Sequence, residues 1–179
     1  TFVIDYFGSR GVTKYSRKLP TPYYDVFDGM RILATHPRID AKRMAIMGFS
    51  RGADITLNTT RAGPSDADGL TLKAHVALYP GCGAWTADAS ITDAPILILV
   101  GDLDTFSSAY GCKLHERDGL AMGKNIRTIV YPGVHHGFDG NYTGTYGAQN
   151  RSAVIVSNAA ATAKARQAVL ALYNRVFAQ

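Results

Sequence analysis

The chain has 179 residues, a length that suits one domain over residues 1–179 and is too short for two ordinary ones. Its 46% apolar and 18% charged residues exclude a disordered chain, and no apolar run reaches the roughly 20 residues of a membrane span. A net charge of +5 would suit an acidic partner, but the basic residues are spread along the chain and no nucleic-acid-binding motif accompanies them. We therefore expect neither a nucleic-acid nor a membrane partner.

Short apolar runs alternate with helical patterns along the whole chain, which predicts a parallel sheet built from β-α-β units. The expected strands are residues 2–6, 44–47, 74–79, 96–100 and 126–131. The expected helices are residues 22–35, 51–60, a stretch within 107–121, and 158–177, and the segments 8–21, 61–69 and 137–150 are expected loops. In such α/β sheets, sites lie at the carboxyl ends of the strands, so the polar residues at those ends are the candidates for function.

A G-x-S-x-G motif, Gly48-Phe49-Ser50-Arg51-Gly52, follows the expected strand 44–47 and precedes a helix. A sharp turn in this position holds a serine with its hydroxyl exposed, and the glycines let strand and helix approach each other. An ordinary glycine turn between a strand and a helix is the alternative. The motif therefore makes Ser50 a candidate nucleophile.

Candidate partners for this serine follow two later strands. Asp102 and Asp104 come after the strand 96–100, and His135 and His136 come after the strand 126–131. Alone, each has a plain structural explanation, because acidic residues cap turns and histidine pairs are usually at the surface. Together, in the order Ser, Asp, His and each at a strand end, they predict a nucleophile with its base and orienting carboxylate.

These motifs resemble the dienelactone hydrolase family. The resemblance rests on GFSRG, on the turn GDLD at 101–104 and on YPGVHHGFD at 131–139, and the segments 5–11 and 79–82 are similar as well. It implies an α/β-hydrolase fold, a three-layer sandwich with a mostly parallel sheet. The five expected strands would correspond to the family's strands 4–8, with the N-terminal part of the domain missing.

The resemblance also implies roles for individual residues. Ser50 is the nucleophile, Asp104 rather than Asp102 is the acid, His136 rather than His135 is the base, and the backbone N–H of Arg51 donates to the oxyanion. Well-known members carry cysteine at the nucleophile position, so serine points to a small-molecule carboxylic ester or lactone as substrate. No metal and no organic cofactor is implied.

The family's second oxyanion donor lies in a segment that has no counterpart among these residues. The expectation is therefore a serine esterase that is completed by an N-terminal segment or by a homo-oligomer. The alternative is a catalytically silent α/β-hydrolase-like binding module or fragment.

Other residues carry weaker expectations. Arg10 is a candidate for pairing with a substrate carboxylate, and Trp85 and Phe106 are candidates for an apolar acyl pocket, with an exposed arginine and ordinary packing as the alternatives. Cys82 and Cys112 form either one disulfide or two buried thiols. A disulfide would indicate a secreted or periplasmic protein, and two thiols a cytoplasmic one.

Overall fold

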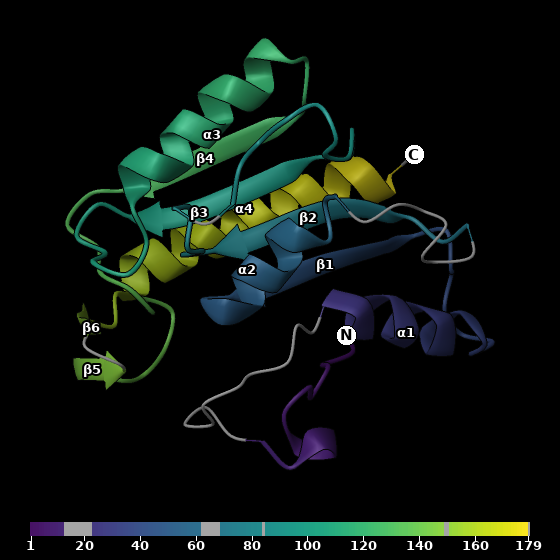
Figure 1. Cartoon of the computed structure of the whole chain (residues 1–179), viewed down its shortest axis with the longest axis horizontal. Helices are drawn as coiled ribbons and strands as arrows, with labels where there is room; N and C mark the ends of the chain where they lie inside the picture. Colours follow the sequence, from purple (N-terminus) through teal and green to yellow (C-terminus); the bar gives the residue numbers. More distant parts are fainter. Residues whose placement is uncertain (13–22, 62–68, 84, 149–150, 179) are drawn as a thin grey trace.

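The computed structural model describes residues 1–12, 23–61, 69–83, 85–148 and 151–178. Its main sheet consists of β1 (Met44–Phe49), β2 (Leu72–Leu78), β3 (Ile96–Gly101) and β4 (Ile126–Tyr131). All four strands are parallel and lie in the order β1-β2-β3-β4 (Figure 1). The carboxyl ends of the strands therefore meet at one edge of the sheet, and four of the five predicted strands are confirmed.

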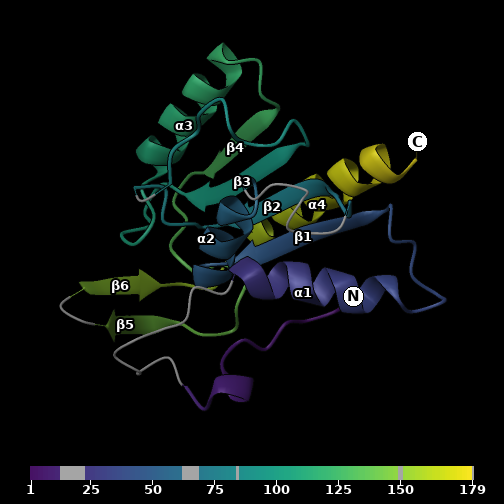
Figure 2. The same ribbon diagram turned by 45° about the vertical axis from the view of Figure 1, so that its right-hand side comes forward.

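Helices cover both faces of this sheet. The long C-terminal helix α4 (Ala159–Phe177) packs on one face, and α2 (Arg51–Asn58) and α3 (Ala109–Ala121) pack on the other (Figure 2). The helix α1 (Tyr23–Ala34) lies beside α2 and contributes Phe27 and Met30 to a separate apolar cluster. The result is the three-layer α/β sandwich that the sequence predicts.

The strand β3 explains why both faces are covered. Successive side chains of a strand point to opposite faces, so Leu97 and Leu99 pack in the α4 layer, whereas Ile96, Ile98 and Val100 pack in the α2–α3 layer. Every residue of β3 is buried. A continuously apolar strand is typical of a parallel sheet with helices on both faces.

The N-terminal residues 2–6 are not a strand, which corrects the sequence prediction. This segment is irregular and leads into the short 3-10 turn Gly8–Arg10, with Phe2 and Val3 exposed. The carboxylate of Asp5 accepts hydrogen bonds from the backbone N–H groups of Phe7 and Gly8, at 3.0 and 2.9 Å. Such a local turn competes with strand pairing, and the described strand nearest in sequence, β1, pairs with β2 alone.

A hairpin lies where a loop was expected. The strands β5 (Gly144–Ala148) and β6 (Arg151–Ile155) pair antiparallel, and Ile155 also forms a bridge with His136. The small and polar residues of β5 carry no strand pattern, so the sequence did not indicate it. The hairpin lies at the end of the sheet where the candidate site is found.

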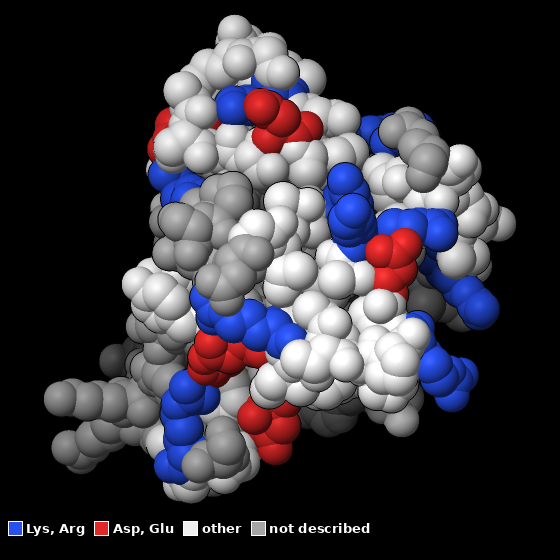
Figure 3. Space-filling model, turned by 90° about the vertical axis from the view of Figure 1, so that its right-hand side faces the viewer, with Lys and Arg blue, Asp and Glu red and all other residues white. Residues whose placement is uncertain are grey.

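On the described part of the face in Figure 3, acidic side chains lie among more numerous basic ones. Several charged side chains of the molecule are paired, for example Arg61 with Asp88 at 2.6 Å and Lys124 with Asp93 at 2.8 Å. Over the ranges that the structure describes, none of the helices has both the length and the apolar character needed to cross a membrane.

Candidate active site

Ser50 occupies the sharp turn between β1 and α2. Its backbone has φ 49° and ψ −118°, a conformation that residues other than glycine rarely adopt. The backbone N–H of Ser50 donates to the carbonyl of Leu78 at 3.0 Å, and its carbonyl accepts from Ala53 at 2.8 Å as α2 begins. The side chain makes no capping bond to the helix, and its hydroxyl is therefore available to another partner.

Close packing around Gly48 makes this turn sterically demanding. A Cβ atom at Gly48 would lie 2.0 Å from the carbonyl oxygen of Gly52, which no side chain can tolerate. A Cβ atom at Gly52 would meet open space. Of the two motif glycines, only Gly48 is thus required for the approach of strand and helix.

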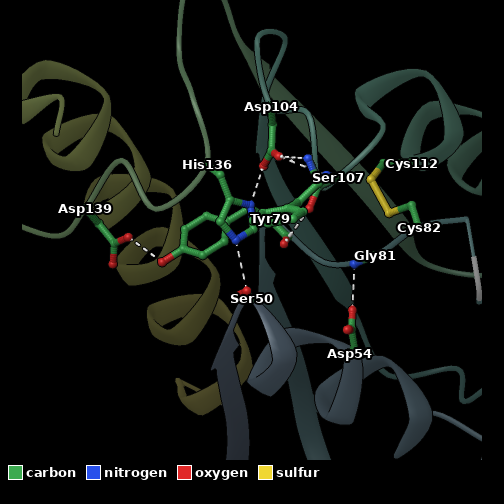
Figure 4. A network of polar contacts seen from close by, with 11 residues as sticks. Ser50, Asp54, Tyr79, Gly81, Cys82, Asp104, Ser107, Cys112, His136 and Asp139 are labelled. Atoms are coloured by element: carbon green, nitrogen blue, oxygen red, sulfur yellow. Dashed lines mark hydrogen bonds and ion pairs between the residues drawn. A yellow bond between two sulfur atoms is a disulfide. The ribbon is translucent and has the colours of Figure 1, made fainter. Parts of the chain in front are cut away.

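The partner of the Ser50 hydroxyl is His136. Ser50 Oγ lies 2.9 Å from His136 Nε2, and His136 Nδ1 lies 2.8 Å from Asp104 Oδ2 (Figure 4). His136 and Asp104 are both buried. Three residues from three different strand ends therefore form one continuous row of hydrogen bonds, with a weak base between a hydroxyl and a carboxylate.

Backbone contacts hold the carboxylate of Asp104 in place. Its Oδ1 accepts hydrogen bonds from the N–H groups of Phe106 and Ser107, both at 2.8 Å, which leaves Oδ2 for His136. Asp102 is exposed and instead accepts from the N–H of Gly133 at 2.7 Å. The structure thus brings Asp104, and not Asp102, to the histidine.

Two further residues at the site, Tyr79 and Asp139, come from segments that carry the resemblance, 79–82 and 131–139. The ring of Tyr79 lies edge-on to His136, with ring centroids 4.6 Å apart, and its hydroxyl donates to Asp139 Oδ1 at 2.6 Å (Figure 4). Burial and the hydrogen bond to Asp139 raise the pKa of Tyr79 far above its ordinary value, so the hydroxyl remains protonated and able to donate. Tyrosine after a buried strand is common in ordinary cores, which is why spacing alone did not identify it.

Asp54, one turn into α2, was also not expected. Its Oδ1 accepts a hydrogen bond from the backbone N–H of Gly81 at 2.6 Å, which ties α2 to the segment after β2. Burial raises the pKa of Asp54, although the Gly81 bond and the charge of Arg51 act in the opposite direction. Asp54 therefore belongs to the supporting structure of the turn that carries Ser50.

The three expected substrate-binding residues occupy different environments. Phe106 is half-buried, with its ring 5.2 Å from that of His136 and 6.2 Å from that of Tyr146. Trp85 is buried in the core beneath α2 and α3, edge-on to His115. Arg10 forms a two-point ion pair with Asp25, at 2.6 and 2.7 Å. Of the three, only Phe106 contacts a residue of the hydrogen-bonded row.

Cys82 and Cys112 are joined by a disulfide with a Cα–Cα separation of 5.2 Å. The bond links the segment after β2, which begins with Tyr79, to the first half of α3 (Figure 4). The disulfide therefore connects the segments that follow β2 and β3 in the chain.

Comparison with known proteins gives the following relationships. The family model described as the dienelactone hydrolase family matches residues 13–177, whereas the search of curated proteins finds no match. A candidate dienelactone hydrolase from Klebsiella pneumoniae subsp. pneumoniae MGH 78578 is similar in structure, with a TM-score of 0.67 and 23% identity over 87% of this chain and 62% of that one.

Two structures from metagenomic libraries are also similar. The dienelactone hydrolase-like promiscuous phosphotriesterase P91 has a TM-score of 0.67 and 17% identity, over 86% of this chain and 61% of its own. MGS-M1, an α/β-hydrolase enzyme from a Medee basin deep-sea metagenome library, has a TM-score of 0.66 and 15% identity. The match covers 94% of this chain and 69% of that one. At these identities the structures show a shared fold. The chain spans about three fifths of the length of the Klebsiella protein and of P91.

Proposed function

Because the chain belongs to the dienelactone hydrolase family, we propose that it is a serine hydrolase that cleaves a carboxylic ester or lactone through an acyl-enzyme. The observation that carries the proposal is the row Ser50–His136–Asp104, with hydrogen-bond distances of 2.9 and 2.8 Å. A serine hydroxyl is a weak nucleophile on its own and becomes reactive when an adjacent, oriented base can take its proton.

In the proposed first step, His136 Nε2 accepts the proton of Ser50 while Oγ attacks the carbonyl carbon of the ester. Asp104 holds the tautomer with a proton on Nδ1 and stabilises the imidazolium that forms. The imidazolium then gives its proton to the leaving alcohol. In the second step His136 takes a proton from water as its oxygen attacks the acyl carbon. His136 then returns that proton to Ser50 Oγ as the bond between Oγ and the acyl carbon breaks and the acid is released.

The negative charge on the attacked carbonyl oxygen needs hydrogen-bond donors. Arg51 is the first residue of α2, and N–H groups in the first turn of a helix carry partial positive charge, so its backbone N–H is the proposed donor. Loss of one of two such donors costs about 10²- to 10³-fold in rate in a well-studied protease. We therefore include in the proposal a second donor from outside these residues, supplied by another segment or another copy of the chain.

The surroundings of the histidine favour an apolar acyl group. Phe106 packs against the imidazole, and Tyr146 of the β5–β6 hairpin packs against Phe106. We propose that these two rings form one side of the acyl site. The Cys82–Cys112 disulfide supports a further proposal, that the protein is secreted or periplasmic, since disulfides persist in oxidising compartments.

The test is covalent labelling with a fluorophosphonate probe followed by peptide mass mapping. We expect an adduct on Ser50 that is absent in Ser50→Ala and His136→Ala. Ser90→Ala is the matched control, because Ser90 is an exposed serine whose hydroxyl and backbone N–H donate to Asp88 rather than to a histidine. If the folded protein takes no label, alone or with added N-terminal sequence, the hydrolase proposal fails and a silent binding module becomes the better account.

A further inference from the structure

Tyr79 contacts residues on both the histidine side and the aspartate side of the site. Its ring contacts the imidazole of His136, and its hydroxyl donates to Asp139, three residues beyond that histidine. Its backbone carbonyl accepts a hydrogen bond from Ser107 Oγ at 2.7 Å. Ser107 in turn holds Asp104 through its backbone N–H. One residue at the end of β2 is thus connected to both the acid and the base.

The backbone of Tyr79 adopts a left-handed conformation, with φ 44°. For a bulky residue this conformation is unusual and strained, so it persists only where surrounding contacts enforce it. In the described part of the chain, Ser50 is the only other residue besides glycine with positive φ. Both outliers therefore lie at the candidate site, on the ends of neighbouring strands.

We propose that Tyr79 and Asp139 form a positioning pair that holds the imidazole of His136 in line with Ser50 and Asp104. This inference rests on the proposed function. The Tyr79 hydroxyl ties the His136 turn to the end of β2, and its ring packs against one side of an imidazole that also contacts Phe106, with centroids 4.6 and 5.2 Å away. Rotation of the imidazole would break either the bond to Ser50 or the bond to Asp104, and the two rings restrict that rotation.

Tyr131 provides a matched comparison for this role. It is the last residue of β4, as Tyr79 is the first residue after β2, and both are 6% exposed. Each ring lies 5.6 Å from that of Phe138. Its hydroxyl, however, has no hydrogen-bond partner among the described residues. Removing the Tyr131 hydroxyl therefore tests burial and packing without touching the proposed pair.

The experiment compares Tyr79→Phe, Asp139→Ala, their combination, Asp139→Asn and Tyr131→Phe. The rate of fluorophosphonate labelling measures the reactivity of Ser50, and thermal unfolding by circular dichroism measures stability. Proton NMR of the imidazole N–H that bonds to Asp104 measures alignment directly. The NMR spectra are also recorded with each variant combined with Ser50→Ala, so that the alignment of His136 is measured independently of any reaction at Ser50.

We expect Tyr79→Phe and Asp139→Ala each to slow labelling by roughly 10-fold, because a hydrogen bond to a carboxylate is lost from the support of the histidine. The combined variant should be no slower than either single one, since both remove the same bond. Asp139→Asn keeps an oxygen acceptor and should recover most of the rate. The imidazole N–H signal should broaden in Tyr79→Phe and stay sharp in Tyr131→Phe.

Two results would overturn the inference. One is a Tyr79→Phe protein that labels at the wild-type rate and keeps a sharp imidazole signal. The other is equal loss of labelling in Tyr79→Phe and Tyr131→Phe together with an equal fall in melting temperature. That result would mean that the loss of labelling comes from weaker packing and not from the Tyr79–Asp139 bond. A wild-type protein that takes no label refutes the proposed function instead, and the NMR comparison in Ser50→Ala still decides whether Tyr79 aligns His136.

Discussion

At the scale of single residues, the site depends on which oxygen of one carboxylate faces the histidine. Asp104 Oδ1 is engaged by two backbone N–H groups, and only Oδ2 is directed to His136 Nδ1. The chain order Ser, Asp, His and the resemblance predicted which residues would meet. The bond between Tyr79 and Asp139 could not be predicted, because nothing in the spacing of residues 79 and 139 indicates that a hydroxyl and a carboxylate meet across 60 positions.

The Asp104→Asn variant tests the role of that oxygen. The asparagine Oδ1 can keep the bonds from Phe106 and Ser107, so its amide N–H₂ would face His136 and favour the tautomer that cannot accept the Ser50 proton. We expect the labelling rate of Ser50 to fall by about 10⁴-fold, the order seen for the equivalent change in a serine protease.

The neighbouring Asp102→Asn variant is the control for this experiment. Asp102 is exposed and accepts only one described hydrogen bond, from Gly133, and asparagine retains an oxygen for it. Labelling at close to the wild-type rate is expected. Equal losses in the two variants would contradict the assignment of Asp104.

At the scale of elements, the site is assembled where strand ends and turns nearly touch. The end of β3 passes directly under the turn that carries His136: a Cβ atom at Gly101 would lie 1.9 Å from the carbonyl oxygen of Val134. That carbonyl also accepts the N–H of Leu103 at 3.0 Å. The glycine at the end of β3 therefore sets the distance between the Asp104 turn and the His136 turn.

Substitution of Gly101 by alanine should disturb both stability and reactivity. The added methyl group must push the Val134 turn away, and overpacking of this kind costs about 1–3 kcal/mol of unfolding free energy. The labelling rate should fall as well, because His136 moves with the turn. Urea unfolding and fluorophosphonate labelling measure the two effects.

Gly83→Ala serves as the comparison, because a Cβ atom at Gly83 meets nothing within 4 Å. It should change the unfolding free energy by less than about 0.5 kcal/mol, as surface substitutions usually do. A Gly101→Ala protein that is as stable and as reactive as Gly83→Ala would show that the turn can shift without cost.

At the scale of the whole molecule, one buried titratable group lies far from the chemistry proposed here. His75 points into the α2 layer from β2, is 2% exposed, and has no hydrogen-bond partner on either ring nitrogen among the described residues. Burial lowers the pKa of His75 from 6.5 to about 4. Near neutral pH the folded protein therefore holds this imidazole uncharged.

The stability of the protein should accordingly fall in mild acid. Between pH 6.5 and about 4 the unfolded chain binds a proton at His75 that the folded protein does not, so acidification favours unfolding. The separation of the two pKa values corresponds to a loss of about 3 kcal/mol by pH 4. Asp54 acts in the opposite sense, because its raised pKa makes the folded protein the stronger proton binder at that carboxyl.

Urea unfolding between pH 4 and 7, in the wild-type protein and in His75→Leu, measures the contribution of this histidine. The difference in unfolding free energy between the two proteins should change with pH in that range, and it should be constant above pH 7. A difference that is independent of pH throughout would contradict a neutral, buried His75.

The sequence by itself determined the class of fold, four of the strands and the residues of the hydrogen-bonded row. The fold class and the strands follow from local signals, namely apolar periodicity and glycine turns. The row follows from polar residues at strand ends in a recognisable order together with the resemblance, which selected Asp104 over Asp102 and His136 over His135. Only the tertiary structure decided the rest, namely the irregular course of residues 2–6, the β5–β6 hairpin, the placement of Trp85 and Arg10 in contacts outside the row, and the Tyr79–Asp139 bond. The physical reason is that strand pairing, burial and long-range hydrogen bonds depend on partners distant in the chain, which local patterns do not record.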